Sequence, residues 1–358
     1  MILVNIMKPK YKLAVVVLCY NEEHYLEECI SSIQEQSYNS FDLVLVDNNS
    51  SDGSVSLVKE KFPQVRIIEN KSNLGFAVAN NIAMKTLFGE GYDICILLNS
   101  DIKADKKYIE NLIKTYEIKK NKNKVGLIQP LIMLYDSPNL INSSGIAVHY
   151  LGFGYAGDYF KKNTTVTSDK EIFAAAGGAS LFTKNFFEDT GGFDESFFMY
   201  CEDQNISWRG FILGYKHFLS HKSLLYHKYK FNKNKKKLFY YERNRLFMFF
   251  ENYSLRSVLI LFPMFIFNEI LIIFYSIING WFFKKINSYL SFLLNIKTVI
   301  KKRKQTQKIR IISDYEVFNK MICSLEFKGI TNYLFLPLNF FYCLFFRLIK
   351  SFYKSKVV

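Results

Sequence analysis

The sequence predicts an α/β fold with a mostly parallel sheet flanked by helices, followed by a hydrophobic, basic, helical C-terminal region. Apolar runs of strand length alternate with segments of helical periodicity through the first half, which is the order of right-handed β-α-β units. The charge is uneven along the 358 residues. Residues 1–227 contain 23 Lys and Arg against 26 Asp and Glu, whereas residues 228–358 contain 24 against 6.

The strands and helices of the first half follow from these patterns. Leu13–Cys19 is continuous, apolar and rich in Val, as is typical of a strand covered on both faces. Four further segments predict strands in the same way: Phe41–Val46, Val65–Glu69, Asp93–Leu98 and Val125–Tyr135. The intervening segments have helical spacing and predict four helices: Tyr25–Ile33, Val55–Lys61, Gly75–Phe88 and Asp105–Lys119.

The pattern is less regular beyond these elements. Asn142–Lys170 is rich in Gly, Asn and Thr with little periodicity, so we expect a long loop region over the site. Ile172–Thr183 predicts a strand around a Gly-Gly pair. Glu202–Leu213 has a helical pattern, and Tyr215–His227 predicts strands.

Polar clusters follow three of the expected strands, at Tyr20–Glu22, Asp47–Gly53 and Asn99–Asp101. Ligands of parallel sheets bind beyond the carboxyl ends of the strands, so these clusters indicate a binding site. A carboxylate at Asp47 suits a pyrimidine base or ribose hydroxyls, and Asp101 suits a divalent cation that binds a diphosphate. The alternative for both is the capping of a turn or helix.

A second acidic region lies among aromatic residues. Five acidic residues fall between Asp189 and Asp203, a combination that suits a sugar and a general base for an acceptor hydroxyl. Glu202 and Asp203 also begin a helix, so stabilisation of the helix dipole is the alternative. His227 ends a strand-like segment, where it is either a ligand or a structural residue.

Missing motifs exclude several classes. No GxGxxG follows the first strand, no GxxxxGK[ST] is present, and Gly177–Ser180 lacks the GxSxG elbow of many hydrolases. The positive net charge comes with no nucleic-acid recognition module, so we predict no nucleic-acid partner. The six cysteines form no CxxC pair, and we interpret them as reduced thiols in a reducing compartment.

Taken together, these clusters resemble the family 2 glycosyltransferases with the GT-A fold, in the rhamnosyltransferase-like branch of bacterial cell-surface polysaccharide synthesis. The resemblance covers about residues 11–255. It rests on six strings in order along the chain: Val17–Glu22, Leu45–Ser54, Asn73–Asn81, Leu97–Asp101, Gly191–Asp203 and Arg243–Arg245.

The resemblance implies a role for each matching position. Asp203 would be the catalytic base with Glu202 beside it, and Asp101 and His227 would hold Mg²⁺ or Mn²⁺. The acceptor side would include Gly178, Asp194 and Trp208. The nucleotide-sugar donor would be bound by Tyr20, Asn21, Glu22, Asp47, Asn49, Asn73, Gly75, Phe76, Asn80 and Asn99.

The metal motif departs from the fuller Asp-x-Asp of many relatives, because Asn99 takes its first position. A carbonyl oxygen of Asn can still coordinate a cation, but more weakly. Asn-x-Asp is itself common in the rhamnosyltransferase-like branch, which favours a donor of that type without deciding it.

The resemblance thus implies an inverting, metal-dependent transfer of a sugar from a dTDP-rhamnose- or UDP-hexose-type donor to a saccharide acceptor, which we expect to be lipid-linked. The alternative is a catalytically inactive carbohydrate-binding or scaffolding protein of the same fold. That alternative predicts a missing base or metal carboxylate, yet Asp101 and Asp203 are both present. A nucleotidyltransferase is disfavoured because residues 1–25 contain no phosphate-binding loop.

We expect a catalytic domain over residues 1–255 and a membrane-associating region over residues 256–358. Val258–Phe283 has 26 residues and one formal charge, Glu269, so as a helix it is long enough to cross a bilayer core. Pro263 and Glu269 favour a kinked, shallow or re-entrant helix instead, since an acidic group at mid-bilayer costs roughly 2–3 kcal/mol. A buried core or an oligomer interface is the further alternative.

Basic residues surround this apolar stretch. Their positions favour an anionic membrane as partner and place the protein at the cytoplasmic face of the cell membrane, where sugar nucleotides are available. The alternative is that they are solvated surface charges. The segments concerned are Lys233–Lys237, Lys301–Lys304 and the shorter apolar stretch Tyr333–Phe346 with the lysines that follow it.

Overall fold

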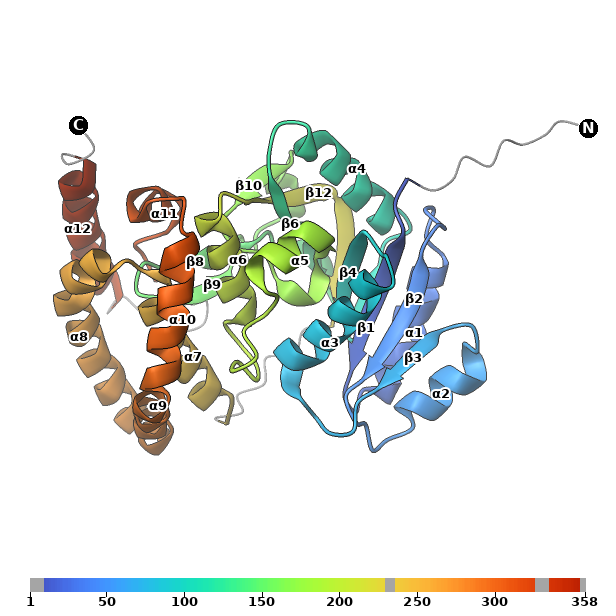
Figure 1. The fold of residues 1–358 in the computed structure, drawn as a ribbon, viewed down its shortest axis with the longest axis horizontal. Coiled ribbons are helices and arrows are strands. Elements are labelled where there is room, and N and C mark those ends of the chain that lie inside the picture. The colour runs from blue at the N-terminus through green and yellow to red at the C-terminus, as the bar shows by residue number, and fades with distance from the viewer. Residues whose placement is uncertain (1–9, 229–235, 326–334, 355–358) are drawn as a thin grey trace, which may run out of the picture.

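A ten-stranded mixed sheet forms the centre of the computed structural model, which describes residues 10–228, 236–325 and 335–354. The main strand order is β10-β12-β6-β11-β4-β1-β2-β3, with β5 beside β12 and β7 beside β6. Figure 1 shows helices packed against this sheet and a group of C-terminal helices at the end of the molecule opposite β3. The predicted fold class is confirmed.

The first half of the chain follows the predicted alternation. The predicted elements lie within a few residues of their expected bounds: β1 (Leu13–Cys19), α1 (Glu23–Gln34), β2 (Asp42–Asp47), α2 (Ser54–Lys61), β3 (Arg66–Glu69), α3 (Gly75–Gly89), β4 (Ile94–Asn99), α4 (Tyr108–Lys120) and β6 (Val125–Leu134). The short strand β5 (Ile102–Ala104) was not predicted. The side chains of β1 are almost wholly buried, which explains its continuous apolar run.

Strand register aligns the carboxyl ends that carry polar residues. β1 lies between β2 and β4 and is parallel to both. Cys19 is paired with Asp47 of β2, and Leu18 is paired with Asn99 of β4. The residues that follow these three strands therefore meet at one edge of the sheet.

The second half of the sheet domain contains more and shorter strands than predicted. The elements here are β7 (Ser137–Ser143), β8 (Ile146–Val148), β9 (Gly154–Ala156), β10 (Lys170–Ile172), β11 (Leu181–Thr183), α5 (Lys184–Thr190), α6 (Glu202–Ile212) and β12 (Lys216–His227). The region predicted as a loop, 142–170, is a loop only in part, because the end of β7 and the paired strands β8 and β9 lie within it. The strand expected over 172–183 is interrupted by a short helical turn, Gly177–Ala179.

The C-terminal helices share a hydrophobic core with the sheet domain. They are α7 (Lys236–Asn252), α8 (Leu255–Ile278), α9 (Phe282–Leu294), α10 (Ile296–Ile309), α11 (Asp314–Lys320) and α12 (Phe335–Lys354). One buried cluster includes Leu151 and Trp208 of the sheet domain, Phe249 of α7, Phe265 of α8 and Phe346 of α12. This region therefore packs closely against the sheet domain.

Four charged side chains are buried together where α7, α8 and α9 meet. Arg245 of α7 contacts Glu242 at 2.9 Å and Glu269 of α8 at 2.5 Å. Lys285 of α9 contacts the same two carboxylates at 2.5 and 2.7 Å. Neither cation is exposed, and two positive charges face two negative ones. We call these four residues the buried charge cluster.

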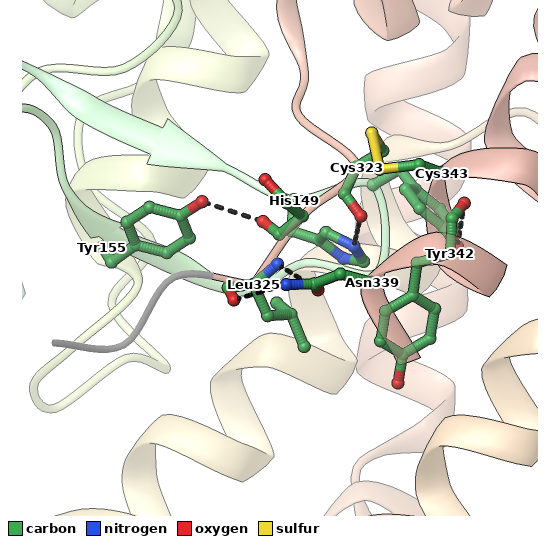
Figure 2. The surroundings of a disulfide bond; sticks show 9 residues. His149, Tyr155, Cys323, Leu325, Asn339, Tyr342 and Cys343 are labelled. Atoms are coloured by element: carbon green, nitrogen blue, oxygen red, sulfur yellow. Dashed lines mark hydrogen bonds between the residues drawn. A yellow bond between two sulfur atoms is a disulfide. The ribbon is translucent and has the colours of Figure 1, made fainter. Parts of the chain in front are cut away.

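One cysteine pair corrects the sequence prediction. Cys323 and Cys343 form a disulfide, with their Cα atoms 4.8 Å apart, although their spacing in sequence gave no sign of a pair. Figure 2 shows the imidazole of His149 beside this bond, in a 3.1 Å hydrogen bond with the Cys323 carbonyl. The prediction that all six thiols are reduced is therefore wrong for two of them.

The remaining cysteines are buried and free: Cys19, Cys29, Cys95 and Cys201. Residues 233–235 of the first basic segment and residues 333 and 334 of the shorter apolar stretch lie outside the described residues, as does the lysine at 356.

Removing one cation of the buried charge cluster should destabilise the protein strongly. In Lys285→Met, two buried carboxylates would share one cation, and we expect a loss of about 3–5 kcal/mol in the free energy of unfolding. The matched control is Lys59→Met, which breaks an exposed pair with Glu69 and should cost less than about 1 kcal/mol. Urea unfolding followed by tryptophan fluorescence measures both. Equal stability of the two variants would contradict the cluster's role.

Candidate active site

The ends of β1, β2 and β4 form the first side of the site. Tyr20 and Asn21 follow β1, and Tyr20 is 45% exposed, which leaves its ring accessible to a ligand. The Asn21 side-chain oxygen accepts a 2.7 Å hydrogen bond from the Ser51 amide, so the loops after β1 and β2 are joined. Both Asn21 and Asn49 have positive φ, at 56° and 68°, in these tight turns.

Asp47 is buried at the end of β2 and organises the turn that follows it. Its carboxylate accepts hydrogen bonds from the backbone amides of Asn49 and Ser50, each at 3.1 Å. The turn-capping alternative is thus present in the structure. Because a carboxylate has further lone pairs, this contact leaves room for the proposed donor contact as well.

Asn48 is a neighbouring residue that the sequence analysis missed. Its side chain donates to Asn73 at 3.0 Å and accepts from the Leu74 amide at 3.1 Å. The Asn73 oxygen in turn accepts from the Gly75 amide at 3.0 Å. Asn48 and Asn73 therefore connect the end of β2 to the start of α3.

Gly75 is required where α3 begins. Its φ is +77°, and a Cβ there would lie 2.4 Å from the Phe198 carbonyl oxygen. The same carbonyl accepts a 2.8 Å hydrogen bond from the Phe76 amide. The segment predicted to bind the donor is therefore in direct contact with the loop that precedes α6.

Phe76 and Asn80 face the protein interior more than the sequence suggested. Phe76 packs edge-on against Phe193, with ring centroids 5.5 Å apart. Asn80 is 1% exposed and donates to the Phe76 carbonyl at 3.0 Å. Asn81, which was not predicted, accepts from the Phe193 amide and donates to its carbonyl, both at 2.9 Å.

Asp101 and His227, which are far apart in sequence, come together in the structure. His227 ends β12 and is paired with Ile102 of β5, next to Asp101. The His227 Nε2 lies 3.0 Å from Asp101 Oδ2, and its Nδ1 lies 2.9 Å from the Asn142 side-chain oxygen. Asn142 lies on β7, in the region predicted as a loop, so its contact was not foreseen.

Glu22 lies on the same edge of the sheet. Its carboxylate accepts a hydrogen bond from the Ser100 hydroxyl. Burial raises the pKa of Glu22, and the nearby negative charge of Asp101 raises it further, although the Ser100 hydrogen bond opposes both. The site therefore concentrates negative charge, which a cation would relieve.

The Asp101–His227 pair fits a divalent cation. If Nδ1–H donates to Asn142, the Nε2 lone pair faces a carboxylate, an arrangement that a proton or metal ion between them would stabilise. Neighbouring ligands of an octahedral ion, each at roughly 2.1 Å, lie roughly 3 Å apart. Asp101 Oδ1 is also buried and has no hydrogen-bond partner among the described residues.

These residues do not make a complete metal cage. Within residues 10–228, 236–325 and 335–354, no group of three or more His, Cys, Asp and Glu side chains is arranged to hold an ion. Mg²⁺ and similar ions commonly take one or two protein carboxylates and fill their remaining positions with phosphate oxygens and water. The donor set therefore suits an ion that binds together with a diphosphate.

Glu202 and Asp203 begin α6 but differ in environment. Asp203 is partly exposed, and its Oδ1 accepts a 2.7 Å hydrogen bond from the Gln204 amide. Burial raises the pKa of Asp203 to about 6, against the effect of backbone hydrogen bonds from Gln204 and Gly177. Glu202 is buried, and this burial together with the Asp203 charge raises its pKa well above the ordinary value.

The Gly177–Ala179 turn lies between the two acidic sites. A Cβ on Gly177 would lie 3.3 Å from Asp203 Cβ, and a Cβ on Gly178 would lie 2.4 Å from the Asn99 side-chain oxygen. One glycine turn thus contacts both the end of β4 and the start of α6. Only small residues allow this approach, which explains the Gly-Gly pair.

Two residues predicted to lie on the acceptor side make contacts within the protein instead. Trp208 is fully buried and packs between Phe173 and Tyr253, so its ring offers no surface to an acceptor. Asp194 is nearly buried and forms an ion pair with Lys302 of α10. We correct both interpretations: Trp208 is a core residue, and Asp194 joins the sheet domain to the C-terminal helices.

Comparison with known proteins identifies the family that part of this chain matches. Residues 14–191 match the family model described as Glycosyl transferase family 2. The chain is 27% identical over 223 residues to an N-acetylglucosaminyl-diphospho-decaprenol L-rhamnosyltransferase of Mycobacterium tuberculosis, which covers 55% of this chain and 69% of the relative. It is 24% identical to a poly-beta-1,6-N-acetyl-D-glucosamine synthase of Staphylococcus aureus, over 56% of this chain and 46% of the relative.

The fold is also similar to that of a solved enzyme. The crystal structure of GalNAc-T7 with UDP, GalNAc and Mn²⁺ superposes with a TM-score of 0.54 and 16% identity, covering 66% of this chain and 47% of that one. At this identity the likeness concerns the fold alone. Residues 14–191 of this chain therefore form a glycosyl transferase family 2 domain with the GT-A fold.

Proposed function

We propose that the protein is an inverting, metal-dependent glycosyltransferase that moves a sugar from a nucleotide-sugar donor to a lipid-linked saccharide at the cytoplasmic face of the cell membrane. The observation that carries this proposal is the glycine turn that contacts both Asp203 and Asn99, which lies two residues before Asp101. The turn brings a candidate metal carboxylate and a candidate base to one edge of the sheet. A donor diphosphate at the first and an acceptor hydroxyl at the second would then be neighbours.

The names of the relatives suggest which class of sugar donor to test first. Their names describe an L-rhamnosyltransferase and an N-acetylglucosamine polymer synthase, both of which act in saccharide assembly. A dTDP-rhamnose-type donor is therefore our first choice and a UDP-hexose-type donor our second. Tyr20 would stack on the nucleobase. The Asp47 carboxylate would accept hydrogen bonds from the nucleoside, and the Asn21 side chain would donate or accept them.

In this mechanism Asp101 and His227 would hold Mg²⁺ or Mn²⁺. The side-chain carbonyl oxygen of Asn99, two residues before Asp101, would be a further ligand. The ion, when bound, stabilises the charge that develops on the leaving nucleoside diphosphate. Asn142 holds the His227 ring in position through Nδ1. This contact orients Nε2 toward the Asp101 carboxylate.

Asp203 would remove the proton of the acceptor hydroxyl as that oxygen attacks the anomeric carbon. A pKa near 6 keeps the carboxylate ionised at neutral pH and still basic enough to accept a proton. Burial and the Asp203 charge raise the pKa of Glu202 well above its ordinary value, which favours the protonated acid beside Asp203. A single displacement with Asp203 on the face opposite the leaving group inverts the anomeric carbon.

The variant Asp203→Asn should bind donor normally and lose about 10²–10⁴-fold in turnover, because an amide cannot accept the proton. In the unaltered enzyme, activity should rise with pH through about 6 as Asp203 ionises. Steady-state rates at several pH values with a saccharide acceptor measure both effects. Asp189→Asn, which removes a half-exposed carboxylate paired with Lys124, is the matched control. Near-normal turnover of Asp203→Asn would remove this residue from the mechanism.

Metal binding should be visible without any turnover. We expect UDP or dTDP together with Mn²⁺ to raise the melting temperature by a few degrees, and EDTA to abolish this shift. Asp101→Asn should lose the shift. The matched control is Asp105→Asn, which changes a carboxylate in the turn before α4 whose oxygen accepts from the Lys107 amide, and which should keep the shift. An EDTA-resistant shift in Asp101→Asn would contradict the metal site.

The C-terminal helices carry an exposed apolar surface that suits a membrane. We call it the outer apolar face; its residues are Leu259, Phe262, Ile266, Ile270, Phe274 and Ile278 of α8 and Phe340, Phe341, Leu344, Leu348 and Phe352 of α12. The two helices are neighbours, since the Tyr342 hydroxyl donates to Asn268 at 2.6 Å. Exposed Arg256, Arg347 and Lys354 lie on the same helices and would bind anionic headgroups.

This surface favours a helix in the membrane interface over one that spans the bilayer. Among the described residues, α8 is the one helix long and apolar enough to cross a membrane by length and composition. Its inner face is buried against protein from Val258 near its start to Ser276 near its end, and Glu269 belongs to the buried charge cluster. Lipid can therefore reach only one side of α8, as in interfacial helices.

Charges placed on the outer apolar face should weaken membrane binding. We expect the double variant Leu259→Asp/Phe262→Asp to lose most of its flotation with vesicles of phosphatidylcholine and phosphatidylglycerol. The matched control is Ile118→Asp, which alters an apolar residue of α4 that is 56% exposed on the sheet domain. High salt should weaken binding of the unaltered protein. Equal flotation of all three proteins would argue against this surface.

A further inference from the structure

The loop that leads into α6 ends in an unfavourable backbone conformation. Tyr200 and Cys201 have φ angles of 67° and 66°, in the left-handed region that residues with a Cβ rarely adopt. Two such residues in succession stand directly before Glu202 and Asp203. Strained backbone of this kind persists only where surrounding contacts hold it.

Asn244 of α7 supplies those contacts. Its side-chain nitrogen donates to the Met199 carbonyl at 2.9 Å and to the Tyr200 carbonyl at 2.8 Å. Asn244 has no exposed surface, so both bonds are made out of contact with water. An amide nitrogen has two donors, and here each is aimed at one carbonyl of the strained segment.

Arg243 orients the Asn244 amide. The Arg243 Nε donates to the Asn244 oxygen at 2.9 Å, which directs the amide nitrogen toward the loop. The Arg243 guanidinium also donates to the Ser196 carbonyl at 2.7 Å. Two successive residues of α7 thus hold carbonyls at 196, 199 and 200, along most of the loop.

The opposite side of the loop is held by the donor-binding segment. The Phe198 carbonyl accepts from the Phe76 amide at 2.8 Å, where Gly75 allows the close approach. The loop therefore lies between α3 and α7. A change in either contact would alter the backbone that positions Asp203.

We propose that Asn244 is a positioning residue for Asp203, holding the left-handed pair Tyr200–Cys201 so that α6 begins where the carboxylate can reach an acceptor hydroxyl; this rests on the proposed role of Asp203. Because the next residue, Arg245, belongs to the buried charge cluster, the C-terminal helices set the position of α7. The helical region thus contributes to catalysis through the backbone of the site.

The first test removes the hydrogen bonds of the Asn244 side chain alone. Asn244→Ala should reduce kcat about 10–100-fold, since small misplacements of a reacting group have effects of this size. The KM for the donor and the melting-temperature shift with UDP and Mn²⁺ should stay unchanged, because the residues proposed to bind the donor are not altered. Asn252→Ala is the matched control: Asn252 is also a buried Asn on α7, but its side chain donates to Asn205 of α6. It should keep its kcat.

The second test relieves the strain. Glycine adopts positive φ without penalty, so in a Tyr200→Gly background the Asn244→Ala change should reduce kcat less than about threefold. The ratio of the two Tyr200→Gly proteins cancels any direct effect of losing the Tyr200 ring. An equally large loss in both backgrounds would overturn the proposal, as would loss of the UDP and Mn²⁺ shift in Asn244→Ala, which would indicate a general structural role.

The outcomes also separate this inference from the proposed function. If the unaltered protein transfers no sugar, the proposed function itself fails. If Asp203→Asn turns over normally, the role of Asp203 as base fails, and this inference fails with it. If Asp203→Asn is inactive while Asn244→Ala has normal kcat, only the positioning role fails.

Discussion

The buried charge cluster is the interaction on which the arrangement of this molecule depends. Arg245 and Lys285 have no contact with water, so their charges are tolerable only while Glu242 and Glu269 face them. This requirement brings α7, α8 and α9 together in one arrangement. It also fixes α7 against the sheet domain, because Arg245 donates to the Leu151 carbonyl at 3.2 Å. A helix held in this way can present Arg243 and Asn244 to the loop before α6, so the C-terminal region contacts the loop that precedes Asp203.

The site itself is an edge at which separate segments meet. Parallel register places the ends of β1, β2 and β4 together, and the antiparallel pairing of β12 with β5 brings His227 to Asp101. The Gly177–Ala179 turn then connects the end of β4 with the start of α6. Burial raises the pKa of Asp203 to about 6, and burial together with the Asp203 charge raises the pKa of Glu202 well above its ordinary value.

The parts of the fold that could be predicted are those in which local pattern and burial agree. Leu13–Cys19 and the strands beside it are apolar because helices cover both faces of the sheet. The segments 142–170 and 172–183 were misjudged because their short strands depend on pairing with β6, β9 and β12 more than on any pattern of their own. Trp208 was misplaced for a related reason: a tryptophan near acidic and aromatic residues resembles a sugar-binding position, and only its packing against Phe173 and Tyr253 reveals a core residue.

The sequence by itself determined the α/β class, the strand-end clusters and the family resemblance, because periodicity and short motifs are local properties of the chain. It also determined that positive charge and apolar residues gather in the C-terminal third. Only the tertiary structure decided that Glu269 is paired with Arg245 and Lys285, that His227 meets Asp101, that Cys323 is bonded to Cys343, and that Asn244 holds the backbone before Asp203. Each of these contacts joins residues distant in sequence or on different elements. Their formation depends on how the elements pack, and no spacing along the chain encodes that.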